Sequence, residues 1–278
     1  MIKVVIWIVY LHLITEIEEL MNNSDWNPEL YLKFNKERLQ SSIDLVSKIE
    51  IEHPQKIIDI GCGPGNSTQI LYKRWSSSNI LGIDKSESMI NKAVADFPNQ
   101  KWKLFDIETN DFQDMYDIVY SNATIQWVPN HNDLLKKLSD IINPYGVLAI
   151  QIPLFFNMPL GKSISNIAQY SNWSHLTKDV DKLFTILNCS EYYDILSDLF
   201  KKINIWETDY VHIMDSHFSI LEMIRSTGLK PYIDKLDNDD KKEIFEDMVL
   251  NAIKSDYPIQ KDKRILFPFK RLFFIGYK

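Results

Sequence analysis

The residues best suited to chemistry stand in a glycine-rich stretch, Asp59-Ile-Gly-Cys-Gly-Pro-Gly65, which follows an apolar run and precedes a helix-like segment. Gly61 and Gly63 allow backbone angles that side chains forbid, and they let the chain approach a ligand closely. A helix that begins here presents free N–H groups and its positive dipole end to a polar or anionic group. The acid Asp59, at the expected end of a strand, completes the pattern D-x-G-x-G-x-G. The stretch therefore predicts a cofactor loop, with a plain tight turn as the alternative.

A second acid, Asp84, ends the next apolar run, about 20 residues beyond the loop. In open α/β sheets an acid at this point accepts hydrogen bonds from ribose hydroxyls, and an ionised carboxylate accepts two of them well. The alternative role is a helix N-cap, for which Ser86 competes. Lys85 lies between Asp84 and Ser86 in the sequence, and we expect it in the cofactor site as well.

Three further residues fit the other end of a nucleoside. Asp106 follows the third expected strand and would accept the amino group of an adenine. Ile107 and Met89 would sandwich the apolar ring. Plain core packing is the alternative for both apolar side chains.

The stretch Asn122-Ala-Thr-Ile-Gln-Trp127 follows the fourth expected strand. This edge faces the crevice at the carboxyl ends of the strands, where ligands bind in such sheets. A small Ala123 leaves room for a ligand, and Trp127 would form one wall. The alternative for Trp127 is to anchor the next helix.

The elements that must position these residues alternate along the chain. The expected buried strands are Lys56–Ile60, Asn79–Ile83, Lys101–Phe105, Asp117–Tyr120 and Gly146–Ile152, and the expected helices between them are Ser67–Trp75, Ser86–Phe97 and Asn132–Ile142. Such alternation predicts an α/β, doubly wound, Rossmann-like fold, with a mostly parallel seven-stranded sheet covered on both faces.

After Pro153 the regular alternation ends. Residues 154–202 look helical and rich in aromatic side chains, which predicts a helical lid. Ile203–Met214 alternates like a strand, and the segment ending in LFFIGY predicts a last strand that begins only after Pro268. Residues 21–153 would then form the cofactor-binding core, and residues 203–278 would complete the sheet and the acceptor pocket.

The first 20 residues include a nearly unbroken apolar run, Met1–Ile14. The run is too short to span a bilayer, which needs about 20 residues. Acidic residues follow it without a small-x-small cleavage site, and Met21 opens a stretch that looks like a natural start. We therefore expect a dispensable extension, with an extra packed element and a targeting segment as alternatives.

The composition is that of a globular protein. Its 278 residues are 45% hydrophobic and 25% charged, with a formal net charge of -7, which disfavours nucleic-acid and anionic-membrane partners. The two cysteines, Cys62 and Cys189, form no CxxC pair. This argues against a disulfide scaffold or a structural zinc site and fits the reducing cytoplasm. We expect a monomer without a bound metal.

Together, these motifs resemble those of class I S-adenosylmethionine-dependent methyltransferases. Several stretches narrow the resemblance to trans-aconitate 2-methyltransferases: Ser24–Tyr31, Gly61–Ser67, Asn122–Trp127, Tyr192–Leu196, Thr227–Pro231, Tyr257–Gln260 and Arg271–Phe274. The resemblance implies S-adenosylmethionine as the cofactor. Trp26 and Tyr31 are expected on an N-terminal helix that closes over it, with ordinary packing as the alternative. The lid between Trp173 and Asn188 departs from the family pattern.

The resemblance also implies a small carboxylic acid as the methyl acceptor. An ionised carboxylate needs no general base, and additional carboxylates need cationic or hydroxyl partners. The expected acceptor-binding residues are Tyr192, Tyr193, His212, Arg225 and Arg271. A hydroxyl or amine acceptor would instead require a base such as His175, His212 or His217.

Other functions remain open from the sequence. A carrier-bound malonyl group or another small metabolite is an alternative acceptor, and a non-catalytic protein that binds the cofactor as a partner subunit is an alternative class. The intact loop with Asp59, Asp84 and Asp106 disfavours the non-catalytic alternative. The absence of an Asn/Asp-Pro-Pro-aromatic motif disfavours a nucleic-acid methyltransferase, and Asp59 before the loop disfavours NAD.

Overall fold

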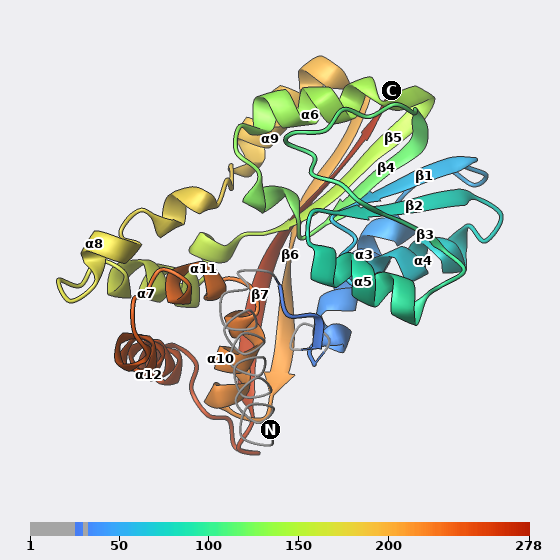
Figure 1. Cartoon of the computed structure of the whole chain (residues 1–278). Helices are drawn as coiled ribbons and strands as arrows, with labels where there is room; N and C mark the ends of the chain where they lie inside the picture. The colour runs from blue at the N-terminus through green and yellow to red at the C-terminus, as the bar shows by residue number, and fades with distance from the viewer. Residues whose placement is uncertain (1–25, 30–32) are drawn as a thin grey trace, which may run out of the picture.

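A seven-stranded sheet crosses the computed structural model, which describes residues 26–29 and 33–278 (Figure 1). The expectations for residues 1–20 and for Tyr31 lie outside the described residues. The strands lie in the order β3-β2-β1-β4-β5-β7-β6. Their bounds are β1 Lys56–Ile60, β2 Asn79–Asp84, β3 Lys101–Leu104, β4 Tyr116–Asn122, β5 Ile142–Pro153, β6 Lys202–Met214 and β7 Ile265–Tyr277.

The first five strands run parallel, and β7 runs antiparallel to both of its neighbours, β5 and β6. The predicted mostly parallel, doubly wound sheet is therefore confirmed. The register places Arg271 of β7 opposite Pro153 at the carboxyl end of β5 and opposite Thr208 of β6. The reversed strand thus brings a C-terminal side chain to the edge of the sheet where the parallel strands end.

Helices cover both faces of the sheet. The helices are α3 Asn35–Ser47, α4 Asn66–Arg74, α5 Glu87–Asp96, α6 His131–Asp140, α7 Pro159–Ile167, α8 Ser174–Thr177, α9 Cys189–Leu199, α10 His217–Arg225, α11 Lys230–Ile233 and α12 Asp239–Asp256, with 3-10 turns η1 Ile125–Trp127, η2 Phe155–Asn157 and η3 Val180–Leu183. Because neighbouring strand residues point to opposite faces, Ile57 packs with α3 and α4, whereas Ile58 packs with α6 and α9.

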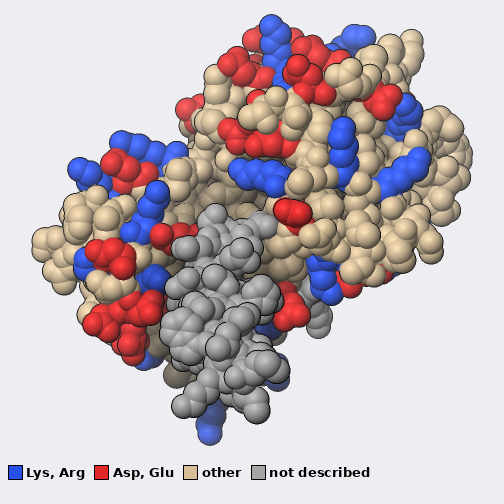
Figure 2. Space-filling model, in the orientation of Figure 1, with Lys and Arg blue, Asp and Glu red and all other residues tan. Residues whose placement is uncertain are grey.

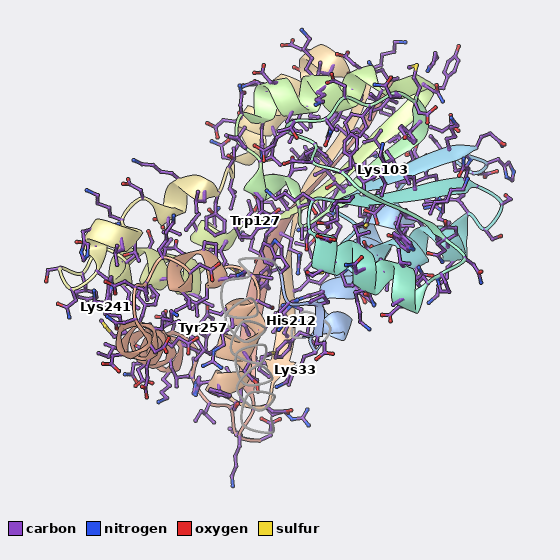
Figure 3. All side chains as sticks on the ribbon, in the orientation of Figure 1. Lys33, Lys103, Trp127, His212, Lys241 and Tyr257 are labelled. Carbon is purple, nitrogen blue, oxygen red and sulfur yellow. The ribbon has the colours of Figure 1, made fainter. Side chains whose placement is uncertain are left out.

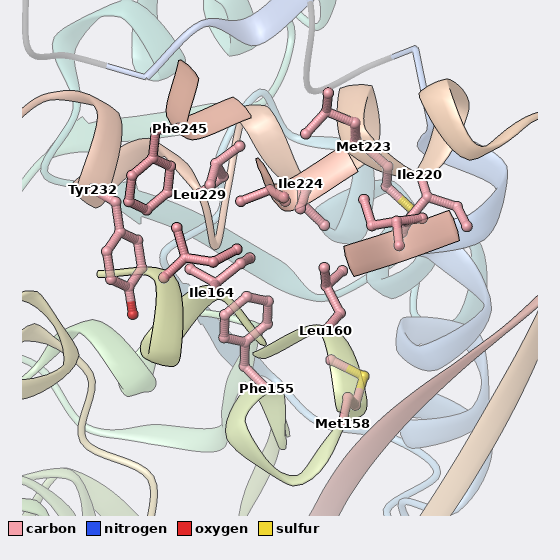
Figure 4. Packing of buried hydrophobic residues seen from close by; sticks show 14 of the residues in the cluster. Phe155, Met158, Leu160, Ile164, Ile220, Met223, Ile224, Leu229, Tyr232 and Phe245 are labelled. Atoms are coloured by element: carbon pink, nitrogen blue, oxygen red, sulfur yellow. The ribbon is translucent and has the colours of Figure 1, made fainter. Parts of the chain in front are cut away.

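A helical lobe packs beside the sheet around its own apolar core. Figure 4 shows side chains from η2, α7, α10, α11 and α12 meeting in this core, including Phe155, Ile164, Ile224, Tyr232 and Phe245. Helix α9 instead packs against the sheet, on β6 and β7. The segment expected as a lid therefore contributes α7 and α8 to the lobe and α9 to the layer that covers the sheet.

The prediction for the start of the last strand was wrong, because β7 begins at Ile265, before Pro268. Pro268 pairs with Val211 of β6, whereas the ladder with β5 begins only at Arg271. Around Pro268 the strand therefore has a neighbour on one side only. Proline is tolerated at such a position because no second ladder needs its missing N–H.

The outer surface mixes both signs of charge. On the face shown in Figure 2, lysine and arginine side chains are interspersed with aspartate and glutamate. None of the helices in the described part of the chain is long and apolar enough to cross a membrane.

The interface between α6 and α9 contains a buried polar pair that should matter for stability. The Tyr192 hydroxyl lies 2.7 Å from His131 Nδ1, while His131 Nε2 lies 2.9 Å from the Ile125 carbonyl oxygen. Because that carbonyl only accepts, Nε2 carries the proton and the Tyr192 hydroxyl donates to Nδ1. Burial lowers the pKa of His131, which favours this neutral ring.

Tyr192→Phe would leave the buried Nδ1 atom without its donor. We expect the free energy of unfolding in urea to fall by about 1–3 kcal/mol. Tyr193→Phe is the matched control. Tyr193 is half-exposed on the same helix, so this variant should unfold like the wild type. An unchanged Tyr192→Phe protein would show that the pair contributes nothing to stability.

Candidate cofactor and acceptor site

A cavity of about 580 Å³ opens at the carboxyl ends of the parallel strands, between the sheet and the helical lobe. Its volume is in the usual range for a small-molecule site, and its place in the fold is the expected one. The predicted site residues that line it are Trp26, Gly61, Gly63, Asp84, Lys85, Met89, Asp106, Ile107, Asn122, Ala123, Trp127 and Arg271.

The glycine loop is shaped by three glycines with positive φ: Gly61, Gly63 and Gly65. Gly61 has φ 70°, and a Cβ atom there would lie 2.1 Å from the side chain of Thr124. Gly63 has φ 54°, and a Cβ atom there would meet no protein atom within 4 Å. Gly61 is thus required by packing, whereas the open side of Gly63 is a cradle that fits a ligand close to the backbone.

Asp59 is fully buried beneath this loop and does not line the cavity. Its Oδ2 atom accepts hydrogen bonds from Thr68 Oγ1 at 2.6 Å and from Ser67 Oγ at 3.0 Å. Gly65 also stays off the cavity, as the N-cap of α4, where a Cβ atom would lie 2.7 Å from Trp102. These two predicted residues hold the loop and the start of α4 in place.

Asp84 joins the loop to the end of β2. Its Oδ2 atom accepts the Gly63 N–H at 2.9 Å, and its Oδ1 atom accepts the Ser86 N–H at 2.9 Å. Ser86 is the N-cap of α5, because its hydroxyl accepts the Met89 N–H at 3.2 Å. The cap role is therefore taken by Ser86, and the Asp84 carboxylate lines the cavity.

The far end of the cavity combines apolar walls with an acid. Met89 and Ile107 are 4% and 8% exposed and both line the cavity. Asp106 Oδ1 accepts the Glu108 N–H at 2.9 Å, so a turn fixes the carboxylate at the rim. Lys85 lies 3.8 Å from the Glu108 carboxylate at the same rim.

Next to Asn122, the cavity passes toward the lobe. Ala123 adopts φ 56°, a left-handed conformation that costs a side-chain-bearing residue energy. Trp127 packs against Trp26, with ring centroids 5.2 Å apart, and against Phe184, at 4.6 Å. In Figure 3 Trp127 lies where the lobe meets the sheet. It is therefore both a wall of the cavity and a packing anchor.

Arg271 is the buried cation on the lobe side of the cavity. Its side chain is 3% exposed, and its Nη1 donates to Gln151 Oε1 at 3.1 Å. The guanidinium also lies 4.7 Å from the centroid of the Phe269 ring. Strand β7 thus presents a fixed, positively charged group to whatever ligand occupies this side.

The structure does not bring the other predicted acceptor residues to the described lining of the cavity. Tyr192 is buried against the sheet, and Tyr193 is half-exposed on α9. Arg225 makes two hydrogen bonds to Glu246, at 2.8 and 2.6 Å.

His212 also stays off the described lining. It is buried, with its ring 6.1 Å from that of Phe269. Its burial, with a further effect of Arg271, lowers its pKa to about 4.

The sequence reasoning missed several lining residues. The aromatic side chains Phe155, Phe184 and Phe269 come from segments with no motif. Arg38 had a usable signal, because it stands in the buried stripe that runs from Phe34, the N-cap of α3, to Leu45 in the helix. A charged residue in the apolar stripe of an amphipathic helix is unusual enough to indicate a function.

The buried Asp59 carboxyl should make stability depend on pH. Burial raises its pKa from 3.8 to about 7, despite the hydrogen bonds from Thr68 and Ser67 that oppose the shift. The folded protein then holds this proton more tightly than the unfolded chain, so ionisation destabilises the fold as the pH rises from about 4 to 7. Asp59→Asn removes the ionisation and should flatten this dependence.

As the pH rises from 5 to 8, the difference in the free energy of unfolding between Asp59→Asn and the wild type should shift by about 2–3 kcal/mol in favour of the variant. Asp117→Asn is the control. The hydrogen bonds from the Lys56 N–H, Asn143 and the Gln55 N–H lower the pKa of Asp117, although burial opposes them. The contribution of Asp117 to the free energy of unfolding is therefore constant between pH 5 and 8. Parallel profiles for wild type and Asp59→Asn would contradict the assignment.

Comparisons with known proteins agree with this geometry. Residues 31–194 match the family model described as "Methyltransferase domain". Trans-aconitate 2-methyltransferase of Escherichia coli O157:H7 (strain EC4115 / EHEC) is 34% identical over 253 residues, covering 91% of this chain and 98% of the relative. The Shigella flexneri protein of the same name is equally similar, with the same identity and coverage.

Solved structures show the same fold at low sequence identity. The YcgJ protein of Bacillus subtilis has a TM-score of 0.58 at 14% identity, covering 86% of this chain and 98% of that one. Coclaurine N-methyltransferase, solved with N-methylheliamine and S-adenosylhomocysteine, has a TM-score of 0.55 at 16% identity, covering 86% of this chain and 72% of that one. The chain belongs to the S-adenosylmethionine-dependent methyltransferases, as its sequence resemblance predicted.

Proposed function

We propose that this enzyme forms the monomethyl ester of a small polycarboxylic acid, with trans-aconitate as the leading acceptor. The observation that carries this proposal is Arg271, a buried guanidinium on the lobe side of the cavity. Arginine binds carboxylates through paired, charge-assisted hydrogen bonds. The similarity to enzymes named for trans-aconitate supports the same acceptor class.

The lining residues fit S-adenosylmethionine laid along the carboxyl edge of the sheet. We assign the adenine to the space between Met89 and Ile107, near Asp106, and the ribose hydroxyls to Asp84. The open side of Gly63 then accommodates the remainder of the molecule. Asp84 lines the cavity, and an ionised carboxylate accepts hydrogen bonds from hydroxyl groups such as those of ribose.

When bound, S-adenosylmethionine supplies an electrophilic methyl group on its sulfonium, which passes to an acceptor oxygen and leaves S-adenosylhomocysteine. The protein then has to align the acceptor and to exclude water. Arg271 would hold a carboxylate that does not react. The rings of Trp127, Phe155 and Phe184 would close the apolar sides of the site.

The proposed chemistry requires no general base, because a carboxylic acid with a pKa of about 4 is ionised at neutral pH. The three histidines weighed as bases, His175, His212 and His217, are outside the described lining of the cavity. His217 Nε2 is instead 2.8 Å from the Tyr257 carbonyl oxygen. This arrangement favours a carboxylate over a hydroxyl or amine acceptor.

The direct test is a methyl-transfer assay with isotopically labelled S-adenosylmethionine and a panel of di- and tricarboxylic acids, followed by mass spectrometry of the products. A labelled monomethyl ester from trans-aconitate, at a higher kcat/KM than from monocarboxylic acids, is the expected result. Methylation of amines or hydroxyls alone would refute the proposed acceptor class while leaving the methyltransferase assignment intact.

Asp84→Ala should weaken the binding of S-adenosylmethionine and S-adenosylhomocysteine by about 1.5–3 kcal/mol, the loss expected for hydrogen bonds to a charged group. Isothermal titration calorimetry measures both affinities. Asp117→Ala is the matched control, because Asp117 also accepts two backbone N–H groups, but at the opposite edge of the sheet. Equal affinities in the Asp84 variant and the wild type would exclude the ribose assignment.

Arg271→Gln should raise the acceptor KM at least about tenfold, which corresponds to about 1.4 kcal/mol of lost binding. The affinity for S-adenosylhomocysteine should stay within about twofold of the wild type, because the two ligands occupy different parts of the cavity. Arg225→Gln serves as the control, since Arg225 pairs with Glu246 away from the described lining. If both variants raised KM equally, Arg271 would have no specific role.

A further inference from the structure

A lysine on α11 stands in the wall of the cavity on the side of the helical lobe. Lys230 begins this helix and lines the cavity, as do Thr227 and Pro231 beside it. Its side chain is only 19% exposed, and its Nζ atom lies 2.8 Å from Asp234 Oδ2, one turn further along. Asp234 lines the cavity too, but its side chain is 41% exposed. The wall therefore contains an ion pair between a mostly covered lysine and a more open aspartate.

Packing on both sides fixes the place of α11. In the turn before it, a Cβ atom on Gly228 would lie 2.6 Å from the ring of Phe155, so this turn packs directly on a wall of the cavity. Within the helix, Tyr232 is fully buried and its hydroxyl donates a hydrogen bond to the carboxylate of Asp181. Figure 4 shows Phe155 and Tyr232 in the same apolar core. Lys230 therefore extends from a backbone that the core of the lobe holds in place.

The proposed acceptor carries more negative charge than Arg271 alone can neutralise. A tricarboxylic acid keeps two ionised carboxylates while the third one is methylated, and each needs a partner when it leaves water. Among the lysines of the described lining, Lys85 lies at the cofactor end and Lys235 is exposed. Arg38 donates to the end of α10 beside the glycine loop. Lys230 is thus the covered lysine on the side where we place the acceptor.

We propose that Lys230 forms a second carboxylate subsite, and that the acceptor replaces Asp234 as its partner when it binds. The inference rests on the proposed function, with Arg271 at the first subsite. The exchange leaves the ammonium group with an anionic partner in both states. It also costs little to release Asp234 to solvent, because a partly exposed ion pair contributes little to stability. Two cations on the lobe side then favour acids with three carboxylates over acids with two.

The test is acceptor binding to the full chain saturated with S-adenosylhomocysteine, measured by calorimetry so that no methyl transfer is needed. The ligands are trans-aconitate and three dicarboxylic acids that each lack one of its carboxylates: cis-glutaconate, itaconate and mesaconate. Lys230→Gln should weaken the binding of trans-aconitate at least about tenfold, as expected for the loss of a charge-assisted hydrogen bond. The dicarboxylate that lacks the group held by Lys230 should change by less than about twofold.

Asp234→Asn distinguishes a ligand contact from a structural role. This variant breaks the same ion pair but keeps the lysine, so trans-aconitate should bind about two- to fivefold more tightly, because it no longer competes with a carboxylate. Lys241→Gln is the matched control. Lys241 also pairs with an aspartate one turn away, Asp237, but outside the described lining, so this variant should bind trans-aconitate like the wild type.

Two results would overturn the inference while leaving the proposed function intact. One is a Lys230→Gln variant that binds trans-aconitate unchanged, or that weakens it and all three dicarboxylates equally. The other is weaker binding of trans-aconitate by Asp234→Asn, and this result decides even if Lys230→Gln does not fold. A wild type that binds S-adenosylhomocysteine but none of the acids would instead refute the proposed acceptor class, and the second subsite with it.

Discussion

The hydrogen bond from the Gly63 N–H to the Asp84 carboxylate is the contact on which the rest of the site depends. It joins the loop after β1 to the end of β2, and it fixes both at the edge where the parallel strands end. Beneath it, Asp59 holds Ser67 and Thr68 in the first turn of α4. The loop therefore keeps its open side toward the cavity before any ligand arrives, which lowers the cost of ordering it on binding.

The second constraint is the direction of β7. Because this strand runs against β5, Arg271 lies opposite Pro153, at the carboxyl edge, although it stands only seven positions before Lys278. A parallel final strand would have required another crossover and would have placed a different residue at this edge. The side of the cavity that we assign to the acceptor thus depends on strand topology as much as on the presence of an arginine.

The sequence predicted the elements whose residues act locally. Asp59 lies in β1, Gly61 follows it directly and Asp84 ends β2, so their motif, spacing and element agree. Phe155 could not be found in this way, because its relevance comes from contacts between distant parts of the chain. Arg38 carries no motif either, and its one signal is a charge in the buried stripe of a helix. The start of β7 was missed for a related reason: whether Pro268 is tolerated depends on how far β5 extends beside it.

The match to the family model ends at residue 194, before several of the residues that line the cavity. Residues 31–194 contain the glycine loop, Asp84, Asp106 and Asn122, whereas Met223, Phe269 and Arg271 lie beyond them. The residues that we assign to the cofactor and some of those that we assign to the acceptor therefore come from different stretches of sequence, and only folding brings them to one cavity. A shared donor fold with a variable acceptor wall allows related chains to methylate different molecules, because function resides in the site rather than in the fold. Arg38 is the exception to this separation: it lies inside the matched segment, yet it donates hydrogen bonds to the end of α10, beyond that segment.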